Sequence, residues 1–89
     1  MGGLNGIDKM LKEKGSISGD ANNYKDNGIY DFDKDKSAFT NIPLNYGTML
    51  VYGGSVYKTQ LVSSIESGES HIRTLSWNGS WSPWKKITS

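Results

Sequence analysis

Two glycine-containing turn signals constrain the fold of this 89-residue chain more than any other feature of its sequence. Gly53-Gly54 separates the alternating segments 48–52 and 55–62, and Asn78-Gly79 separates 71–77 from 81–87. Both dipeptides tolerate the positive φ angles that a tight hairpin loop needs. With a further alternating segment at 28–32, the pattern predicts about five short strands. We therefore expect a mainly β fold, a small antiparallel sheet.

The predicted first hairpin sets which side chains share a face. A two-residue loop at Gly53-Gly54 places Tyr52 opposite Ser55. One face then carries Leu50, Tyr52, Tyr57 and Leu61, and the other carries Met49, Val51, Val56, Lys58, Gln60 and Val62. Because both faces are partly apolar, we expect the second to meet another layer or another chain.

Residues 1–14 have the spacing of a short amphipathic helix. Leu4, Ile7 and Leu11 recur at intervals of three and four, and Gly15 is a suitable end. Two readings stay open: the helix packs on its own domain, or it forms the end of a multi-stranded stalk. The predicted division is an N-terminal helix and linker at 1–19 and a β domain at 20–89.

Composition narrows the classes of partner. Leu, Ile, Val and Phe make up only 18 of the 89 residues and cysteine is absent, so the expected core is marginal and oligomerisation is the expected reinforcement. The net charge of +1 argues against a broad nucleic-acid surface. The longest apolar runs are too short to span a membrane, and the first residues do not resemble a signal peptide.

Few side chains of this sequence are candidates for catalysis. His71 is the only histidine and no cysteine exists, so the sequence predicts a protein that is not an enzyme and needs no cofactor. Asp31, Asp33 and Asp35 alternate as at the start of a calcium loop, but Lys36 stands where that loop needs glycine. We interpret this stretch as a solvated acidic turn and predict no metal site.

Three tryptophans fall within eight residues, 77–84. They either fill the core of a chain poor in aliphatic residues or lie exposed, where indoles stack on sugar rings. Arg73, the sole arginine, is suited to stacking on an aromatic ring or pairing with a carboxylate. The candidate ligand contacts are Tyr52, His71, Arg73, Trp77 and Trp81.

The order of these features resembles the pyocin-knob type domain of bacteriophage and phage-tail-like fibre proteins. The resemblance covers roughly residues 20–88, and its most specific element is the closing segment W-N-G-S-W-S-P-W at 77–84, followed by Lys85-Lys86-Ile87. Earlier elements are Gly28-Ile29-Tyr30, Asn41-Ile42-Pro43 and Gly47. The matching positions that the resemblance implies to be structural are Gly28, Tyr30, Gly47, Asn78, Gly79 and Trp84.

The resemblance implies a small knob in a phage tail fibre or receptor-binding protein. Such fibres are generally homotrimers of the virion tail, and their distal parts adsorb to host surface saccharides such as teichoic acid or lipopolysaccharide. No catalytic residue is carried over. Two alternatives stay open: a purely structural trimerisation or spacer domain of the fibre, and a carbohydrate-binding module of a cell-wall-active enzyme.

Overall fold

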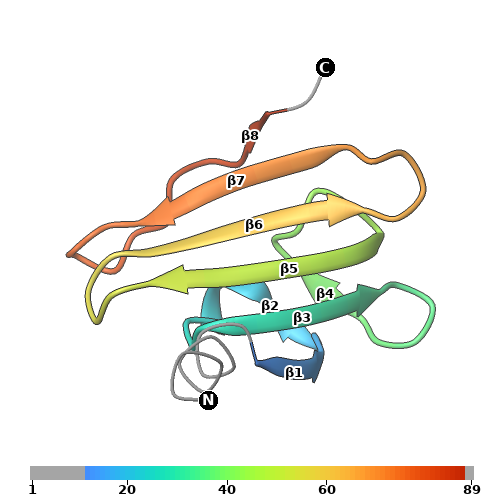
Figure 1. The fold of residues 1–89 in the computed structure, drawn as a ribbon, viewed down its shortest axis with the longest axis horizontal. Coiled ribbons are helices and arrows are strands. Elements are labelled where there is room, and N and C mark those ends of the chain that lie inside the picture. Colours follow the sequence, from blue (N-terminus) through green and yellow to red (C-terminus); the bar gives the residue numbers. More distant parts are fainter. Residues whose placement is uncertain (1–11, 88–89) are drawn as a thin grey trace, which may run out of the picture.

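The computed structural model describes residues 12–87, which form a mainly β fold (Figure 1). The strands are β1 (Glu13–Ser16), β2 (Gly19–Asp20), β3 (Gly28–Asp33), β4 (Phe39–Thr40), β5 (Tyr46–Gly53), β6 (Lys58–Ser64), β7 (Ser70–Leu75) and β8 (Lys85–Lys86). A single 3-10 turn, η1 (Ala21–Asn23), follows β2, and Asp20 caps it by accepting from the Asn22 backbone N–H. The predicted mainly β class is confirmed.

The main sheet has six strands in the order β1-β3-β5-β6-β7-β8. From β3 to β8 every neighbouring pair is antiparallel, as predicted. At the edge, however, β1 runs parallel to β3, and β2 pairs in parallel with β4 in a separate two-stranded sheet. The expectation of a purely antiparallel sheet is therefore wrong, because the segment before β3 adds its own strand to the edge.

The predicted N-terminal helix is not supported where it can be checked. Its residues 1–11 lie outside the described part of the chain, and Glu13 and Lys14 belong to β1. The Lys12 carbonyl accepts the Ile29 N–H at 2.9 Å, which ties this segment to β3. Sheet hydrogen bonds to a strand 16 residues away thus override the helix predicted to extend through residues 12–14.

The first hairpin has a longer loop than the sequence predicted. Gly53 still pairs with Lys58, so the loop comprises residues 54–57 and is closed by a 3.1 Å hydrogen bond from the Gly54 N–H to the Tyr57 carbonyl. Tyr52 consequently lies opposite Thr59 rather than Ser55. Gly53 has a φ of 139°, and a side chain there would meet the Tyr57 carbonyl oxygen at 2.2 Å. Glycine is therefore required at position 53 because the Tyr57 carbonyl lies close to it, and not because position 53 belongs to a two-residue turn.

The Asn78-Gly79 turn forms, but the strands around it are shorter than expected. The Gly79 N–H donates to the Ser76 carbonyl at 3.0 Å, and Gly79 has a φ of 83°. β7 ends at Leu75, which forms an isolated bridge with Trp81, and regular pairing resumes only at β8. The predicted strand over 81–87 is therefore reduced to two residues.

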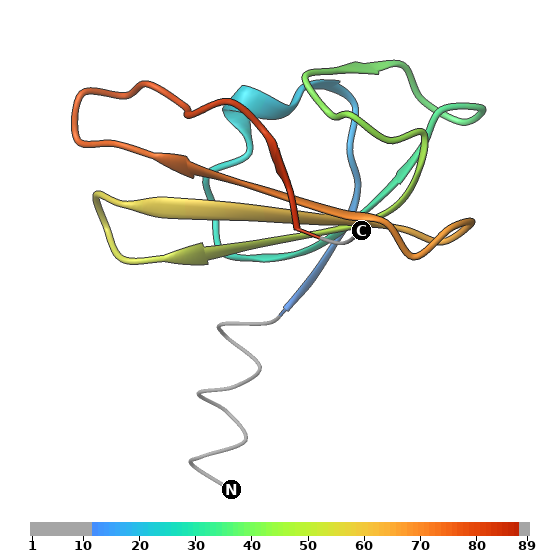
Figure 2. The same ribbon diagram turned by 90° about the horizontal axis from the view of Figure 1, so that it is seen from above.

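The sheet has one covered face and one open face (Figure 2). The covered face lies under a layer formed by η1, β2, β4 and the connection 76–84. In the part of the chain that the structure describes, no element lies over the open face. Across β3, β5, β6 and β7 the open face carries one register row of half-buried aliphatic side chains: Ile29, Leu50, Leu61 and Ile72.

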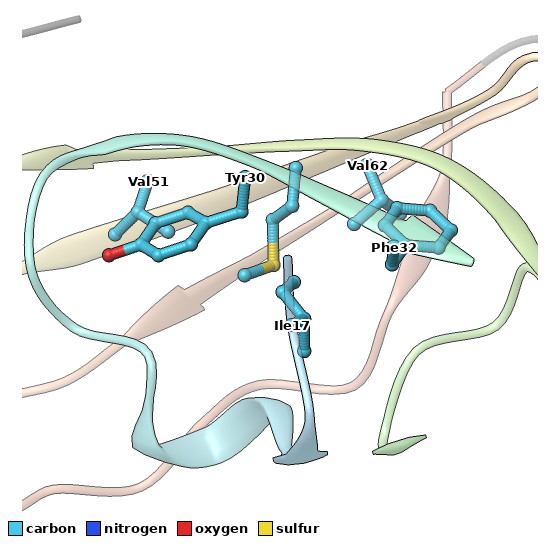
Figure 3. Close-up of a cluster of buried hydrophobic side chains, with 6 residues drawn as sticks. Ile17, Tyr30, Phe32, Val51 and Val62 are labelled. Carbon is cyan, nitrogen blue, oxygen red and sulfur yellow. The ribbon is translucent and has the colours of Figure 1, made fainter. Parts of the chain in front are cut away.

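The core lies between the covered face and its layer. Tyr30 and Phe32 from β3 point down from the sheet with Val51 and Val62, and Ile17, between β1 and β2, reaches up towards them (Figure 3). Met49 completes the buried cluster. Tyr24 and Phe39 pack at its margin through edge-to-face contacts with Tyr30 and Phe32, with ring centroids 5.1 and 5.6 Å apart.

Candidate functional site

A guanidinium stacked between two indoles lies under the connection that covers the sheet. The Arg73 guanidinium lies 4.4 Å from the ring centroid of Trp81 and 4.5 Å from that of Trp84. Arg73 is only 5 % exposed, so these contacts are desolvated, where each contributes about 1–2 kcal/mol. Burial lowers the pKa of Arg73 to about 10, which still leaves it charged at neutral pH. The predicted stacking of Arg73 on an aromatic ring is confirmed.

Gln60 holds this arginine in place. The Arg73 Nε–H donates to the Gln60 Oε1 at 2.8 Å, and the Gln60 Nε2 donates to the carbonyls of Ala21 at 2.8 Å and Tyr24 at 2.9 Å. Gln60 is fully buried, and all three of these bonds use its amide group. The amide therefore fixes both the arginine on β7 and the η1 loop above it.

The two indoles of the stack also bond to the covering loops. The Trp81 Nε1–H donates to the Asn22 carbonyl at 3.1 Å, and the Trp84 Nε1–H donates to the Asn41 carbonyl at 2.9 Å. Each tryptophan thus contacts the cation with its ring and a loop with its N–H. We conclude that Trp81 and Trp84 are parts of the scaffold rather than a free binding surface.

The third tryptophan lies elsewhere. Trp77 is 76 % exposed, and with Tyr57 at 64 %, Val56 at 50 % and Tyr52 at 37 % it makes up most of the exposed large hydrophobic surface of the described residues. We call these four residues the aromatic tip. They come from the β5–β6 loop, from β5 and from the turn after β7, all at the same end of the sheet (Figure 1).

Polar groups adjoin the aromatic tip. Lys58, half-buried at the start of β6, donates from Nζ to the Asn27 Oδ1 at 3.0 Å, and the Asn27 Nδ2 donates to the Gly53 carbonyl at 3.0 Å. Asn78, next to Trp77, accepts from the Ser80 N–H at 3.1 Å. Rings with nearby amides and an ammonium are the combination that binds sugars, whose rings have apolar C–H faces and hydroxyl edges.

His71 belongs to a different cluster, near the other end of the sheet. Its Nε2 lies 2.5 Å from Glu69 Oε2, and Lys86 Nζ lies 3.5 Å from Glu69 Oε1. The hydrogen bond with His71 and the charge of Lys86 hold the pKa of Glu69 below its usual range. This ion cluster links β8 to the β6–β7 turn.

The five predicted ligand contacts are therefore divided among three places. Tyr52 and Trp77 belong to the aromatic tip, Arg73 and Trp81 lie in the buried stack, and His71 lies in the ion cluster. Sequence reasoning did not single out Tyr57 and Val56 as ligand contacts, since it paired both within the hairpin. Both residues are exposed because the β5–β6 loop has four residues, and a single sequence does not specify the length of a loop.

Two negative findings concern the described residues, 12–87. No group of three acidic or histidine side chains there could hold a metal ion, and none of its helices has the length and apolar character to cross a membrane. In comparisons with known proteins, no family model, curated protein or solved structure matches the chain.

Proposed function

We propose that this protein is a non-enzymatic adsorption module of a phage tail fibre or receptor-binding protein, and that its aromatic tip binds a host surface glycan. The observation that carries the proposal is the exposure of Tyr57, Trp77 and Tyr52 on segments that lie at the same end of the sheet. Exposed aromatic side chains in water carry a free-energy cost that a stacking ligand relieves. The sequence resemblance to pyocin-knob domains supplies the fibre context.

The scaffold supports this role because paired strand residues anchor the segments that carry the tip. Leu75, next to the turn that carries Trp77, is buried and pairs with Lys58, next to Tyr57. The Arg73 stack lies directly below, two residues earlier in β7. A preorganised surface loses less conformational entropy when a glycan binds.

We further propose that the native assembly is a homotrimer displayed on the virion. Single protein–sugar sites are weak, and three copies on one fibre raise the apparent affinity for a polymer with repeated sugars. The trimer therefore compensates for a tip of only a few side chains.

The test is binding of the purified chain to purified teichoic acid and lipopolysaccharide by biolayer interferometry. Trp77→Ala and Tyr57→Ala should each weaken binding, with about thirtyfold for Trp77 if it is the principal contact. Ile87→Ala, which shortens another exposed hydrophobic residue away from the tip, is the matched control and should bind normally. Binding that survives loss of both Trp77 and Tyr57 would refute the assignment of the tip.

A structural role is the second candidate, and the open face favours it. The aliphatic row Ile29, Leu50, Leu61 and Ile72 has no covering layer within the described residues, so it suits contact with another chain in a fibre. A purely structural module would assemble into trimers yet bind neither polymer. A monomer that binds glycan would instead favour a carbohydrate-binding module of a cell-wall-active enzyme.

A further inference from the structure

A cavity of about 230 Å³ lies at the end of the sheet opposite the aromatic tip. It lies where β3 ends and β5 begins, beside Ile65 of the β6–β7 turn, and these segments are on the right-hand side of Figure 1. Its lining residues are Ser16, Asp31, Phe32, Asp33, Lys36, Tyr46, Gly47, Thr48 and Ile65. The aromatic tip contributes none of them, so the cavity is a separate feature.

Strand register brings the polar lining together. Asp31 is the register partner of Ser16 on β1 and of Thr48 on β5, so these three side chains form one row on the open face. Asp33 of β3 and Tyr46 of β5 form the next register pair on the same face of the sheet. Carboxylates and hydroxyls from three strands thus converge on one hollow.

Most of these polar groups are not used by the fold. The side chains of Asp31, Thr48 and Ser16 make no hydrogen bond or ion pair within residues 12–87, and Lys36 has no carboxylate partner there. The Asp33 Oδ1 accepts the Asp35 N–H at 2.9 Å, which leaves its second oxygen free. The cavity therefore offers two carboxylates, two hydroxyls and an ammonium to a ligand.

Size and composition define the ligand class. The volume is below the roughly 300–1,000 Å³ of pockets for drug-sized molecules and suits a single sugar ring. Carboxylates accept hydrogen bonds from ring hydroxyls or an amino group, and the ring of Tyr46 with the exposed Ile65 supplies apolar lining. Two carboxylates against one ammonium disfavour an acidic sugar.

We propose that this cavity is a saccharide subsite that binds one neutral or amino pyranose unit and discriminates against uronic acids. Asp31 is the principal acceptor, and Thr48 and Ser16 complete the polar edge. The subsite is independent of the aromatic tip, and the proposal does not rest on the tip binding a glycan.

The test is an NMR titration of the ¹⁵N-labelled full chain with the methyl glycosides of glucose, N-acetylglucosamine, glucosamine and glucuronic acid, each up to about 50 mM. The first three glycosides carry neutral or amino sugars. At least one of these three should shift the backbone amide signals of Gly47, Thr48 and Ile65, with a dissociation constant of about 1–10 mM. The glucuronide should produce no shift at these residues. Equal binding of the glucuronide, or no shift with any glycoside, overturns the proposal.

Matched variants separate binding in the cavity from changes in folding. Asp31→Asn should weaken binding at least about tenfold, whereas Asp26→Asn, an exposed carboxylate near the other end, should not. Thr48→Tyr should fill the cavity and abolish binding, whereas Thr74→Tyr places the same side chain at another exposed position of the same face. Unchanged affinity in both cavity variants overturns the proposal even if the glycoside binds elsewhere.

The same spectra distinguish this subsite from the aromatic tip. Shifts confined to Tyr57 and Trp77 overturn the subsite while the proposed adsorption function stands. Shifts confined to Gly47, Thr48 and Ile65 support the subsite even if the tip binds no glycan.

Discussion

Replacing Gln60 by methionine tests the central polar network most directly. Methionine keeps the length and approximate volume of the side chain but makes none of its three hydrogen bonds. The Arg73 Nε–H and the Tyr24 carbonyl then lose their Gln60 partner, whereas the Ala21 carbonyl keeps its bond from the Tyr24 N–H at 3.1 Å. Each orphaned group costs about 1–3 kcal/mol. After about 1 kcal/mol is returned by the more apolar side chain, we expect a loss of about 3 kcal/mol in the free energy of unfolding.

Urea denaturation followed by tryptophan fluorescence measures this loss, since Trp81 and Trp84 lie on the network. Thr59→Met is the matched control, because Thr59 precedes Gln60 on β6 but faces the other side of the sheet. Its effect should be within about 0.5 kcal/mol of zero. If Gln60→Met lowers the free energy of unfolding by less than about 1 kcal/mol, the three hydrogen bonds of the buried amide do not stabilise the fold to the expected extent.

A double-mutant cycle isolates the contact between Gln60 and Arg73. Arg73→Met removes the guanidinium, so in the double variant no arginine N–H is left without its glutamine partner. The two substitutions should therefore cost about 1–3 kcal/mol less together than the sum of their separate effects. Additive costs would mean that the 2.8 Å Nε–H bond contributes nothing to folding.

Three further predictions follow from the geometry. Trp84→Ala should cost about 3 kcal/mol in urea denaturation, because it removes one side of the stack and an N–H bond to a loop; an effect below about 1 kcal/mol would contradict this. Gly47→Ala should lower the stability by about 2 kcal/mol or more, since the added methyl would lie 1.9 Å from the Ser63 carbonyl oxygen; a midpoint equal to wild type would be inconsistent with that approach. The folded state holds the pKa of Glu69 below the ordinary 4.5, so the stability that its ionised carboxylate contributes is complete above pH 4.5 and is lost as the pH falls through the lowered pKa. The urea midpoint of wild type should therefore drop more between about pH 6 and pH 3 than that of Glu69→Gln, and equal drops would show that the contacts of Glu69 with His71 and Lys86 do not stabilise the fold.

Alternation and turn residues were enough to predict the central strands, but not their register or the pairing of β3 with β5. The segments 28–32, 48–52 and 71–77 all contain strands, because each has a period of two and is bounded by turn-forming residues. The same alternation correctly separated Met49, Val51 and Val62 from Leu50, Tyr52 and Leu61. The side-chain period of a strand is local information, so one sequence suffices for it.

The edges and the covering layer required information that local patterns lack. Glu13 and Lys14 are in β1 because β3 provides hydrogen-bonding partners, which no spacing of apolar residues reveals. Gln60 stands among apolar neighbours, and its role depends on Arg73, Ala21 and Tyr24, which are brought to it only by the folded chain. For the candidate site, the sequence identified Trp77 and Tyr52, but the length of the β5–β6 loop decided that Tyr57 would be exposed.

The bonds that hold the covering loops have a consequence for how this protein can change. The donors are side chains of the sheet and of the 76–84 connection, and the acceptors are main-chain carbonyls: those of Ala21, Asn22, Tyr24 and Asn41. Every amino acid has that carbonyl, so an exposed loop position such as Asn23 can be substituted without losing the acceptors, whereas Asn41, with a φ of 65° and a side-chain bond to Asp20, is restricted for other reasons. The constraint on residue identity falls on Gln60, Trp81 and Trp84 instead, because their side chains donate these bonds. For the bonds that hold the covering loops, the fold thus concentrates its sequence requirements in three donor side chains rather than in the loops themselves.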